Sequence, residues 1–343
     1  MVCKNKSQRH RIEYHDGFSD NLVPLEPLDL SKINSFSDMA EAMSKTALGA
    51  RNLGEAVDVL YEMKDKYVVL TLSGIMTVAK MGLIISDLIE QNIVNAVVST
   101  GALITHGFIE NAGMRHFKCE GKINDKELYK KGYDRIYDTL ELESNLLNIE
   151  KIIFEVLKTL DSPTSSREVN HELGKYLSEK VKGRGILKSA YEKDVPVYIP
   201  AFTDSELGLD LALYNKTAEN IKFDAFRDLE HITEQILQQD EVGIFTIGGG
   251  VPRNWAQQVA PFSEELQKRF KTKLVRYKYG VRICPEPVHW GGLSGCTYSE
   301  GVSWGKFFPE DEGGRYAEVY CDATLVLPIM VKALFERIQK NSE

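Results

Sequence analysis

Three short apolar runs, each closed by small residues, constrain the fold of this chain more than any other feature. An unbroken apolar run indicates a strand covered on both faces, which is typical of parallel sheets. Segments of helical length follow the turns, so the pattern predicts an α/β fold with a doubly wound, mostly parallel sheet and helices on both faces. The runs and their closing residues are Tyr67–Leu72 with Ser73-Gly74, Ala96–Ser99 with Thr100-Gly101-Ala102, and Val242–Ile247 with Gly248-Gly249-Gly250.

The alternation of strands and helices continues along the chain, which predicts a single domain over 31–343 behind a polar N-terminal arm over 1–30. An apolar stripe over 142–160 indicates core packing or, alternatively, an oligomer seam, and Ser165 with Glu168 forms a capping box for the next helix. Further strands are expected at 197–202, 274–283 and within 317–327, and helices at 35–64 with a break near Gly49 and Gly54, at 75–91, and throughout 124–194.

Composition excludes several classes of protein. The 343 residues carry a formal net charge of −8, which argues against a nucleic-acid partner and suits cationic small molecules. We find no apolar window long enough to span a membrane, and no apolar leader at the N-terminus. The five cysteines are scattered and lack CxxC spacing, so we expect a cytoplasmic protein without disulfides.

The small-residue turns are candidates for a phosphate-binding edge. Ligands of open parallel sheets bind beyond the carboxyl ends of the strands, where glycine lets backbone N–H groups approach phosphate. The alternative explanation for each turn is tight strand-to-helix packing. No GxGxxG is present, so a Rossmann-like dinucleotide site would have to be built from several turns. Asp204 and Asp322 follow apolar strands, and each could cap a helix or bind a ribose hydroxyl.

A glycine-rich segment over 289–306 holds the largest number of candidate functional side chains close together in the sequence. Ordering such a segment costs conformational entropy, and function is the usual reason to order one. Lys306 follows Trp304 and Gly305, and desolvation against the indole would lower its pKa and free the amine to form a Schiff base. The alternative is an ordinary surface lysine. The histidines His106, His116 and His289 have no obvious metal spacing, so no metal site is predicted.

Four ordered motifs give the chain, over about 67–338, a resemblance to the deoxyhypusine synthase family. The loop at 289–297 is similar to that of the bacterial branch called deoxyhypusine synthase-like. The resemblance implies an NAD-dependent transfer in which spermidine is oxidised to an imine, a lysine captures the aminobutyl group, and an acceptor amine receives it. The motifs are Pro200-Ala-Phe-Thr-Asp204, Ile247-Gly-Gly-Gly-Val251, Glu300-Gly-Val-Ser-Trp-Gly-Lys306 and Tyr320-Cys-Asp-Ala-Thr-Leu-Val326.

By this resemblance Lys306 is the imine-forming lysine, and a pocket for the amine surrounds it. The residues expected to bind the amine are Trp304, Glu300, Asn254, His106, Asp210, His289 and Trp290. The residues expected to bind NAD are Ser73, Gly74, Thr100, Gly101, Ala102, Asp204, Gly248, Gly249, Gly250, Ser294, Asp322 and Ala323.

The chain departs from the family at the amine pocket. Asn254 stands where the family has a histidine, and Leu209 and Leu293 replace two aspartates that hold ammonium groups, with Asp210 one place from the first. The family's paired glutamates become Thr105 and His106. Leucine cannot form an ion pair with an ammonium group and asparagine is a poor base, so we expect substrate recognition to differ from that of the family. The lysine and the residues expected to bind NAD are present, so we expect the same chemistry.

Three functions remain open at this point. The first is aminobutyl transfer to a small polyamine acceptor such as putrescine or agmatine, the second is modification of a lysine on a translation factor, and the third is an NAD- or polyamine-binding sensor without turnover. The family implies a homotetramer with active sites shared between subunits. All three tryptophans, Trp255, Trp290 and Trp304, lie in the last 90 residues, and we expect them to border one pocket.

Overall fold

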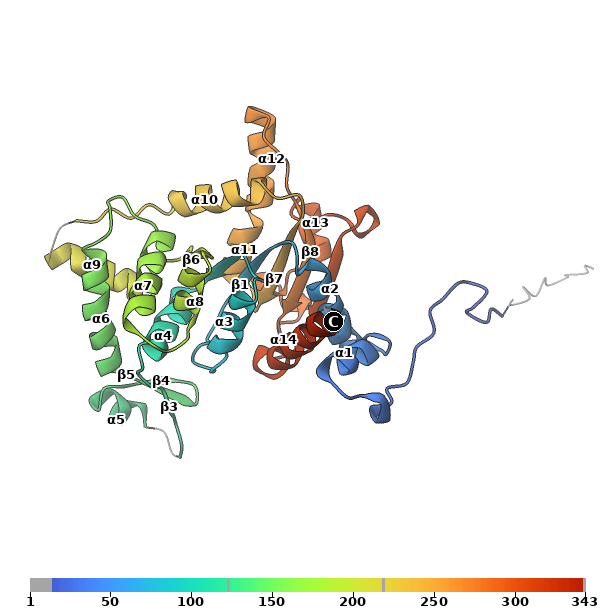
Figure 1. The fold of residues 1–343 in the computed structure, drawn as a ribbon, viewed down its shortest axis with the longest axis horizontal. Coiled ribbons are helices and arrows are strands. Elements are labelled where there is room, and N and C mark those ends of the chain that lie inside the picture. The colour runs from blue at the N-terminus through green and yellow to red at the C-terminus, as the bar shows by residue number, and fades with distance from the viewer. Residues whose placement is uncertain (1–13, 122–123, 218–219, 342–343) are drawn as a thin grey trace, which may run out of the picture.

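A six-stranded parallel sheet forms the centre of the computed structural model, which describes residues 14–121, 124–217 and 220–341 (Figure 1). The strand order is β6-β2-β1-β7-β8-β9. Counted along the chain within this sheet, the order is that of dinucleotide-binding folds, and the order reverses between β1 and β7. The strands are β1 Tyr67–Leu72, β2 Ala96–Ser99, β6 Val197–Tyr198, β7 Val242–Ile247, β8 Tyr277–Ile283 and β9 Arg315–Val319.

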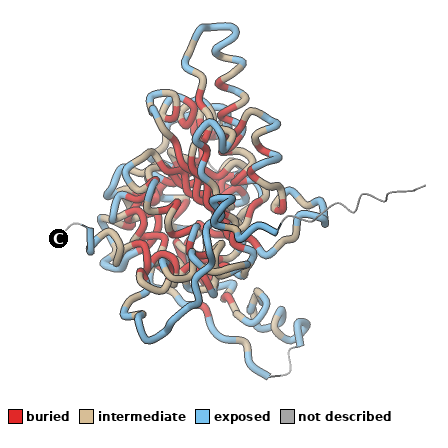
Figure 2. The backbone as a smooth tube through the Cα atoms, turned by 90° about the vertical axis from the view of Figure 1, so that its right-hand side faces the viewer, coloured by how far each residue is buried: buried red, intermediate tan, exposed pale blue. Residues whose placement is uncertain are grey.

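Alternate residues of the strands belong to two hydrophobic clusters, one on each face of the sheet. Val68 and Leu70 of β1 lie in the larger cluster, whereas Val69 lies in the smaller one. Both faces are therefore covered by helices, as the continuous apolar runs predict, and buried backbone is concentrated at the centre of the molecule (Figure 2).

The helices follow the order α1 Phe36–Ser44, α2 Leu48–Met63, α3 Gly82–Glu90, α4 Gly101–Asn111, α5 Asp125–Lys130, α6 Glu143–Leu157, α7 Ser166–Lys180, α8 Ile186–Glu192, α9 Glu206–Thr217, α10 Phe226–Leu237, α11 Gly250–Gln257, α12 Val259–Phe270, α13 Tyr298–Ser303 and α14 Ala323–Lys340. The predicted capping box at Ser165 and Glu168 is present. The apolar stripe packs as core through Ile149, Ile153 and Val156.

A small antiparallel sheet corrects the expectation of continuous helix over 124–194. Strands β3 Phe117–Lys118, β5 Thr139–Leu142 and β4 Tyr133–Ile136 pair in that order. The link between β4 and β5 is only Tyr137-Asp138, and Tyr137 has φ 54°, which closes a hairpin. The alternation in these short strands was hidden between the longer helical segments on either side.

Two predicted helix boundaries are also wrong. The segment expected as a helix from 75 begins only at Gly82, because the chain turns at Lys80 with φ 66°. The break expected near Gly49 and Gly54 is present close to Gly49, since α1 ends at Ser44 and α2 begins at Leu48 with φ 59°, but the expectation is wrong for Gly54. Gly54 lies within α2, and its missing Cβ leaves room for the backbone of Ser44, which an added Cβ would meet at 2.3 Å.

The N-terminal arm is described from residue 14, and the first thirteen residues of the expected arm lie outside the described residues. From Tyr14 to Asp29 the arm has no regular helix or strand, and its apolar side chains, including Phe18 and Val23, are exposed. In Figure 1 the arm runs away from the sheet beside α1.

Candidate active site

Lys306 lies in a pocket of about 260 Å³ between α11 and α13, and its backbone carbonyl accepts a hydrogen bond from the N–H of Tyr277, where β8 begins. Its Nζ donates a hydrogen bond of 2.9 Å to Asn254 Oδ1 on α11, and it lies 6.0 Å from the centre of a Trp304 ring. The pocket therefore joins two segments about fifty residues apart in sequence. The lining residues are Gly250, Arg253, Asn254, Gln257, Gln258, Leu293, Cys296, Thr297, Glu300, Gly301, Trp304 and Lys306.

The surroundings of Lys306 favour the uncharged amine. The residue is 9 % exposed, and burial lowers the pKa of Lys306, with a further lowering by the charge of Arg253. Its hydrogen-bond partner is a neutral amide, which stabilises the ammonium less than a carboxylate would. The ring of Trp304 thus lies beside the amine, and burial is the main cause that lowers its pKa.

A tight turn presents Lys306 to the pocket. Thr297 caps α13 by accepting a hydrogen bond from the backbone N–H of Glu300, and the helix ends at Trp304. Gly305 has φ 67°, a conformation that favours glycine, and the N–H of Lys306 then donates back to Gly301 O. The next residue, Phe307, is fully buried and anchors the turn.

Two buried arginines, which the sequence analysis missed, hold the glycine-rich segment in place. Arg282 on β8 donates from Nη1 to the carbonyls of Ser294 (2.6 Å) and Cys296 (2.8 Å), and from Nη2 to Glu318 (2.6 Å). Arg253 donates to Cys296 O at 2.7 Å. Both arginines are at most 3 % exposed. A charged residue within an apolar strand was the available signal for Arg282.

The predicted cofactor residues gather where the strand order reverses, at the ends of β1 and β7. Ser73 Oγ accepts a hydrogen bond from Gly249 N at 2.9 Å. Gly248 has φ 83°, and a Cβ there would meet Ser73 Oγ at 2.0 Å; a Cβ on Gly249 would meet Ser294 Cα at 2.6 Å. Three segments thus pack so closely that only glycine fits at 248 and 249, as the tight-packing alternative expects, whereas an added Cβ on Gly250 would meet nothing within 4 Å.

The neighbouring strand ends complete this edge. Thr100 caps α4, and a Cβ on Gly101 would meet Ser205 Cβ at 2.1 Å. Asp322 caps α14 by accepting from Thr324 N at 2.7 Å, so the helix-capping alternative holds for it. Ser205, rather than Asp204, bonds into the first turn of α9, and the Asp204 side chain is exposed at the strand end.

Several predicted amine-binding residues do not line the pocket of Lys306 in this chain. Asp210 is buried on α9, and burial raises its pKa to about 7. His106 lies against His116 and Glu141. His289 and Trp290 form an exposed pair, with Trp290 72 % exposed.

The prediction that three tryptophans border one pocket is wrong, because Trp304 is the one that lines it. Trp255 adjoins Asn254, but its ring packs against Tyr198 with centroids 5.6 Å apart. Consecutive helical residues point about 100° apart, so Asn254 and Trp255 serve different faces of α11.

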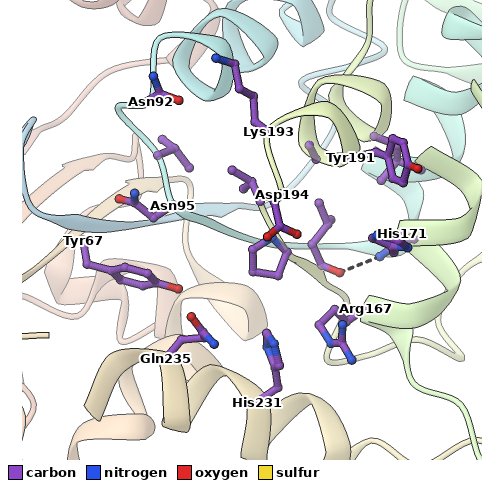
Figure 3. Close-up of a pocket in the computed structure, with 17 residues that line it drawn as sticks. Tyr67, Asn92, Asn95, Arg167, His171, Tyr191, Lys193, Asp194, His231 and Gln235 are labelled. Carbon is purple, nitrogen blue, oxygen red and sulfur yellow. Dashed lines mark hydrogen bonds between the residues drawn. The ribbon is translucent and has the colours of Figure 1, made fainter. Parts of the chain in front are cut away.

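A second cavity, of about 290 Å³, lies at the amino ends of the strands (Figure 3). Tyr67 begins β1 there, and Asn95 precedes β2. Arg167, Asp194 and His231 also line it. None of the predicted site residues lines this cavity, whereas Asn254, Glu300, Trp304 and Lys306 line the smaller pocket between α11 and α13, which is therefore the candidate active site.

The fold and the site define a parallel α/β protein with a dinucleotide-type sheet edge beside a buried lysine. The family model for deoxyhypusine synthase matches residues 38–334, and the chain belongs to the deoxyhypusine synthase family. This family consists of NAD-dependent aminobutyl transferases, so the chain is an enzyme of the transferase class.

Relatives span nearly the whole chain. A protein of Methanosarcina acetivorans named "Probable deoxyhypusine synthase 2" is 34 % identical over 94 % of this chain and 92 % of its own. A deoxyhypusine synthase-like protein of Chlorobaculum tepidum is also 34 % identical, over 90 % and 88 %. A solved Entamoeba histolytica structure provisionally named deoxyhypusine synthase shares the fold, with a TM-score of 0.57 at 16 % identity, covering 91 % of this chain and 97 % of its own.

None of the helices in the described ranges combines the length and the apolar character needed to cross a bilayer.

Proposed function

We propose that this protein transfers an aminobutyl group between small amines through an imine at Lys306. The observation that carries the proposal is the buried amine of Lys306, held by a neutral amide at 2.9 Å and walled by Trp304. A lysine with a lowered pKa is the nucleophile that imine formation requires. An ordinary surface lysine, the alternative from sequence, would be hydrated and charged.

The chain's own residues would carry the transfer as follows. The neutral amine of Lys306 attacks the electrophilic carbon of the oxidised donor, and the departing amine of the donor takes the proton that Lys306 loses. Asn254 Oδ1 orients the amine for this attack. The Trp304 ring excludes water from one side and stabilises a cationic imine through its π face. The acceptor amine then attacks the same carbon and releases Lys306.

The turn after β7 fits NAD at Gly250, which begins α11 and where an added Cβ would meet nothing within 4 Å, so that the backbone lies open to a pyrophosphate. Thr100, Asp204 and Ser294 adjoin the same edge of the sheet and would contribute to holding the cofactor. When bound, NAD would supply reversible hydride transfer, so that the overall reaction has no net oxidation.

The charges of the pocket favour a small acceptor and altered recognition of the donor. Glu300 is the carboxylate among the lining residues, against the cations Arg253 and Lys306. Leu293, which replaces an ammonium-binding aspartate of the family, lies in the lining with its apolar side chain. With one carboxylate in its lining, the pocket of this chain would hold the donor at one ammonium group, and a short acceptor needs no further carboxylate.

The test is an assay of purified protein with NAD, spermidine and a panel of single acceptors that includes putrescine and agmatine. We expect a new polyamine by mass spectrometry, and borohydride should trap an adduct at Lys306. Lys306→Ala should lower turnover roughly a thousandfold or more. Lys306→Arg, which keeps the positive charge but cannot form the imine, is the matched control and should be equally inactive. Unchanged turnover in Lys306→Ala would overturn the mechanism.

A second candidate is transfer to a protein lysine, which the naming of the archaeal relatives as deoxyhypusine synthases favours. Spermidine labelled in its aminobutyl carbons would then mark a purified translation factor. Label in the factor with none in small amines would favour this candidate. NAD or amine binding without product in either assay would indicate the sensor.

A further inference from the structure

A cluster of two histidines and one glutamate lies apart from the Lys306 pocket. His106 is on α4, His116 lies just before β3, and Glu141 is on β5. Glu141 Oε2 is 2.6 Å from His116 Nε2 and 3.3 Å from His106 Nδ1, and the two nitrogens are 3.3 Å apart. The side chains of His116 and Glu141 are at most 1 % exposed.

The three facing atoms are spaced almost as the ligands of a tetrahedral metal ion. They all lie within 4.8 Å of one another. Bonds of about 2.0–2.2 Å to zinc place neighbouring ligand atoms roughly 3.3 Å apart. Both contacts of His106 already have this spacing. The contact between His116 and Glu141 would open by about 0.7 Å, which a change of side-chain torsion can supply.

The surroundings orient the carboxylate for binding. Glu141 Oε1 accepts from Asn145 Nδ2 at 2.7 Å and from Leu142 N at 2.8 Å, which leaves Oε2 facing the histidines. Burial opposes ionisation of Glu141, but the hydrogen bonds from His106, His116 and Asn145 hold its pKa well below its usual range. Fixed outer partners of this kind orient metal ligands in known sites.

Lys80 is the remaining charged group that faces the cluster. Its Nζ lies 3.0 Å from His116 Nδ1 and 3.4 Å from Glu110. Binding through His116 Nε2 requires the tautomer with its proton on Nδ1. Lys80 would then release the ring and pair with Glu110, which is already within reach. The metal would thus replace the hydrogen bond between His116 and Glu141 without leaving Lys80 unpaired.

We propose that His106, His116 and Glu141 form a binding site for a divalent transition metal of the zinc class. Two imidazoles and one carboxylate match the preference of zinc and its neighbours, whereas calcium and magnesium prefer oxygen ligands throughout. A bound metal would link the small antiparallel sheet to α4. The first turn of α4 contains Gly101 and Ala102, which are candidate cofactor-binding residues. His106 is 16 % exposed, which leaves an open side for water as the fourth ligand.

Metal content of the tag-free full-length protein tests this proposal directly. Chelator-stripped protein is titrated with Zn²⁺ against a chromogenic chelator, and with Co²⁺ while visible absorption is recorded. We expect one equivalent per chain and the intense bands of four- or five-coordinate cobalt. Absence of uptake, or the weak spectrum of octahedral cobalt, would overturn the proposal without reference to any variant.

Variants locate the site. His106→Ala and Glu141→Gln should abolish stoichiometric uptake, whereas Asn145→Leu should weaken the affinity about 10- to 100-fold by removing one of the two hydrogen bonds that hold Glu141 Oε1. His171→Ala is the matched control, because His171 also bonds a glutamate, Glu172, but has no third ligand in the clusters found among the described residues. Uptake that survives in Glu141→Gln and His106→Ala would place the metal elsewhere.

Discussion

At the scale of single residues, burial and the charge of Arg253 lower the pKa of Lys306, and its hydrogen-bond partner Asn254 adds no opposing charge. A neutral acceptor leaves the pKa of Lys306 lowered by burial and by Arg253. Because the free amine is the reactive form, activity should rise as the pH rises through this lowered pKa. Asn254, which stands where the resemblance to the family implies a histidine, is a group that positions the amine and takes no proton itself.

Asn254→Asp tests this role with almost no change of shape. The carboxylate would pair with the ammonium and raise the pKa of Lys306, so the rising limb of the pH–rate profile should move up by about 1–3 pH units. At pH 7.5 we expect a loss of roughly tenfold or more that recovers in more alkaline buffer. The measurement is kcat against pH. Asn254→Ser, which keeps a neutral acceptor, should leave the position of the limb unchanged.

At the scale of elements, the glycine-rich segment keeps its shape because β8 and β9 hold it through Arg282 and Glu318. Arg282 is 1 % exposed, and its guanidinium bonds Glu318 and two loop carbonyls at once. Glu318 also accepts from the N–H of Tyr298, where α13 begins. Any change in this pair is therefore transmitted to the turn that carries Lys306.

Arg282→Leu should lower the free energy of unfolding by about 3–5 kcal/mol, because it leaves Glu318 and the carbonyls without their partner. Denaturant titration measures the loss. Arg282→Lys keeps the charge but cannot make all three bonds, so its loss should be intermediate. A variant Arg282→Leu as stable as the wild type would show that the pair does not hold the segment.

The turn after β7 gives a second test at this scale. A Cβ at Gly249 meets Ser294 Cα at 2.6 Å, which forces the two backbones apart. Overpacking of this kind costs about 1–3 kcal/mol, so Gly249→Ala should weaken NAD binding roughly 5- to 150-fold in calorimetric titration. Gly49→Ala is the control, since a Cβ there meets nothing within 4 Å and should leave binding unchanged.

The same elements explain how far the sequence could predict the site. The strand ends were predictable because Ser73 and Gly248–Gly250 close apolar runs, and parallel strands bring such ends together. The lysine pocket was predictable around Trp304 and Lys306 because they are neighbours in sequence. The contact between Lys306 and Asn254 was suggested only through the family, since no local pattern joins residues 52 positions apart. His116 and Glu141 meet through the pairing of β3 with β5, which the helical expectation concealed.

At the scale of the whole molecule, the single chain gives only part of the site that the family implies. Asp210, His106 and Trp290 lie outside the Lys306 pocket, and Leu209 and Trp290 expose large apolar side chains. The homotetramer with shared sites stays a prediction, which light scattering of the purified protein would check. A monomer that turns over amines would contradict it.

Asp210 provides a prediction about stability and pH. Burial, with Glu206 and Glu150 adding repulsion, raises its pKa to about 7, so the folded protein holds a proton that the unfolded chain has released above pH 4. The free energy of unfolding should therefore fall as the pH rises from about 4 to 7. Asp210→Asn removes this effect and should be more stable than the wild type by ~4 kcal/mol at pH 8, and by ~1.5 kcal/mol at pH 5.

Chemical denaturation of both proteins at the two pH values measures this difference, and Asp311→Asn, at an exposed carboxylate, is the matched control. The result bears on the assembly. If a cationic group of a second chain or a bound polyamine faces Asp210, the carboxylate is stabilised and its pKa falls. The advantage of Asp210→Asn would then vanish or reverse at pH 8. A stabilised variant would mean that Asp210 stays desolvated and protonated near neutral pH, in which case it cannot anchor an ammonium group.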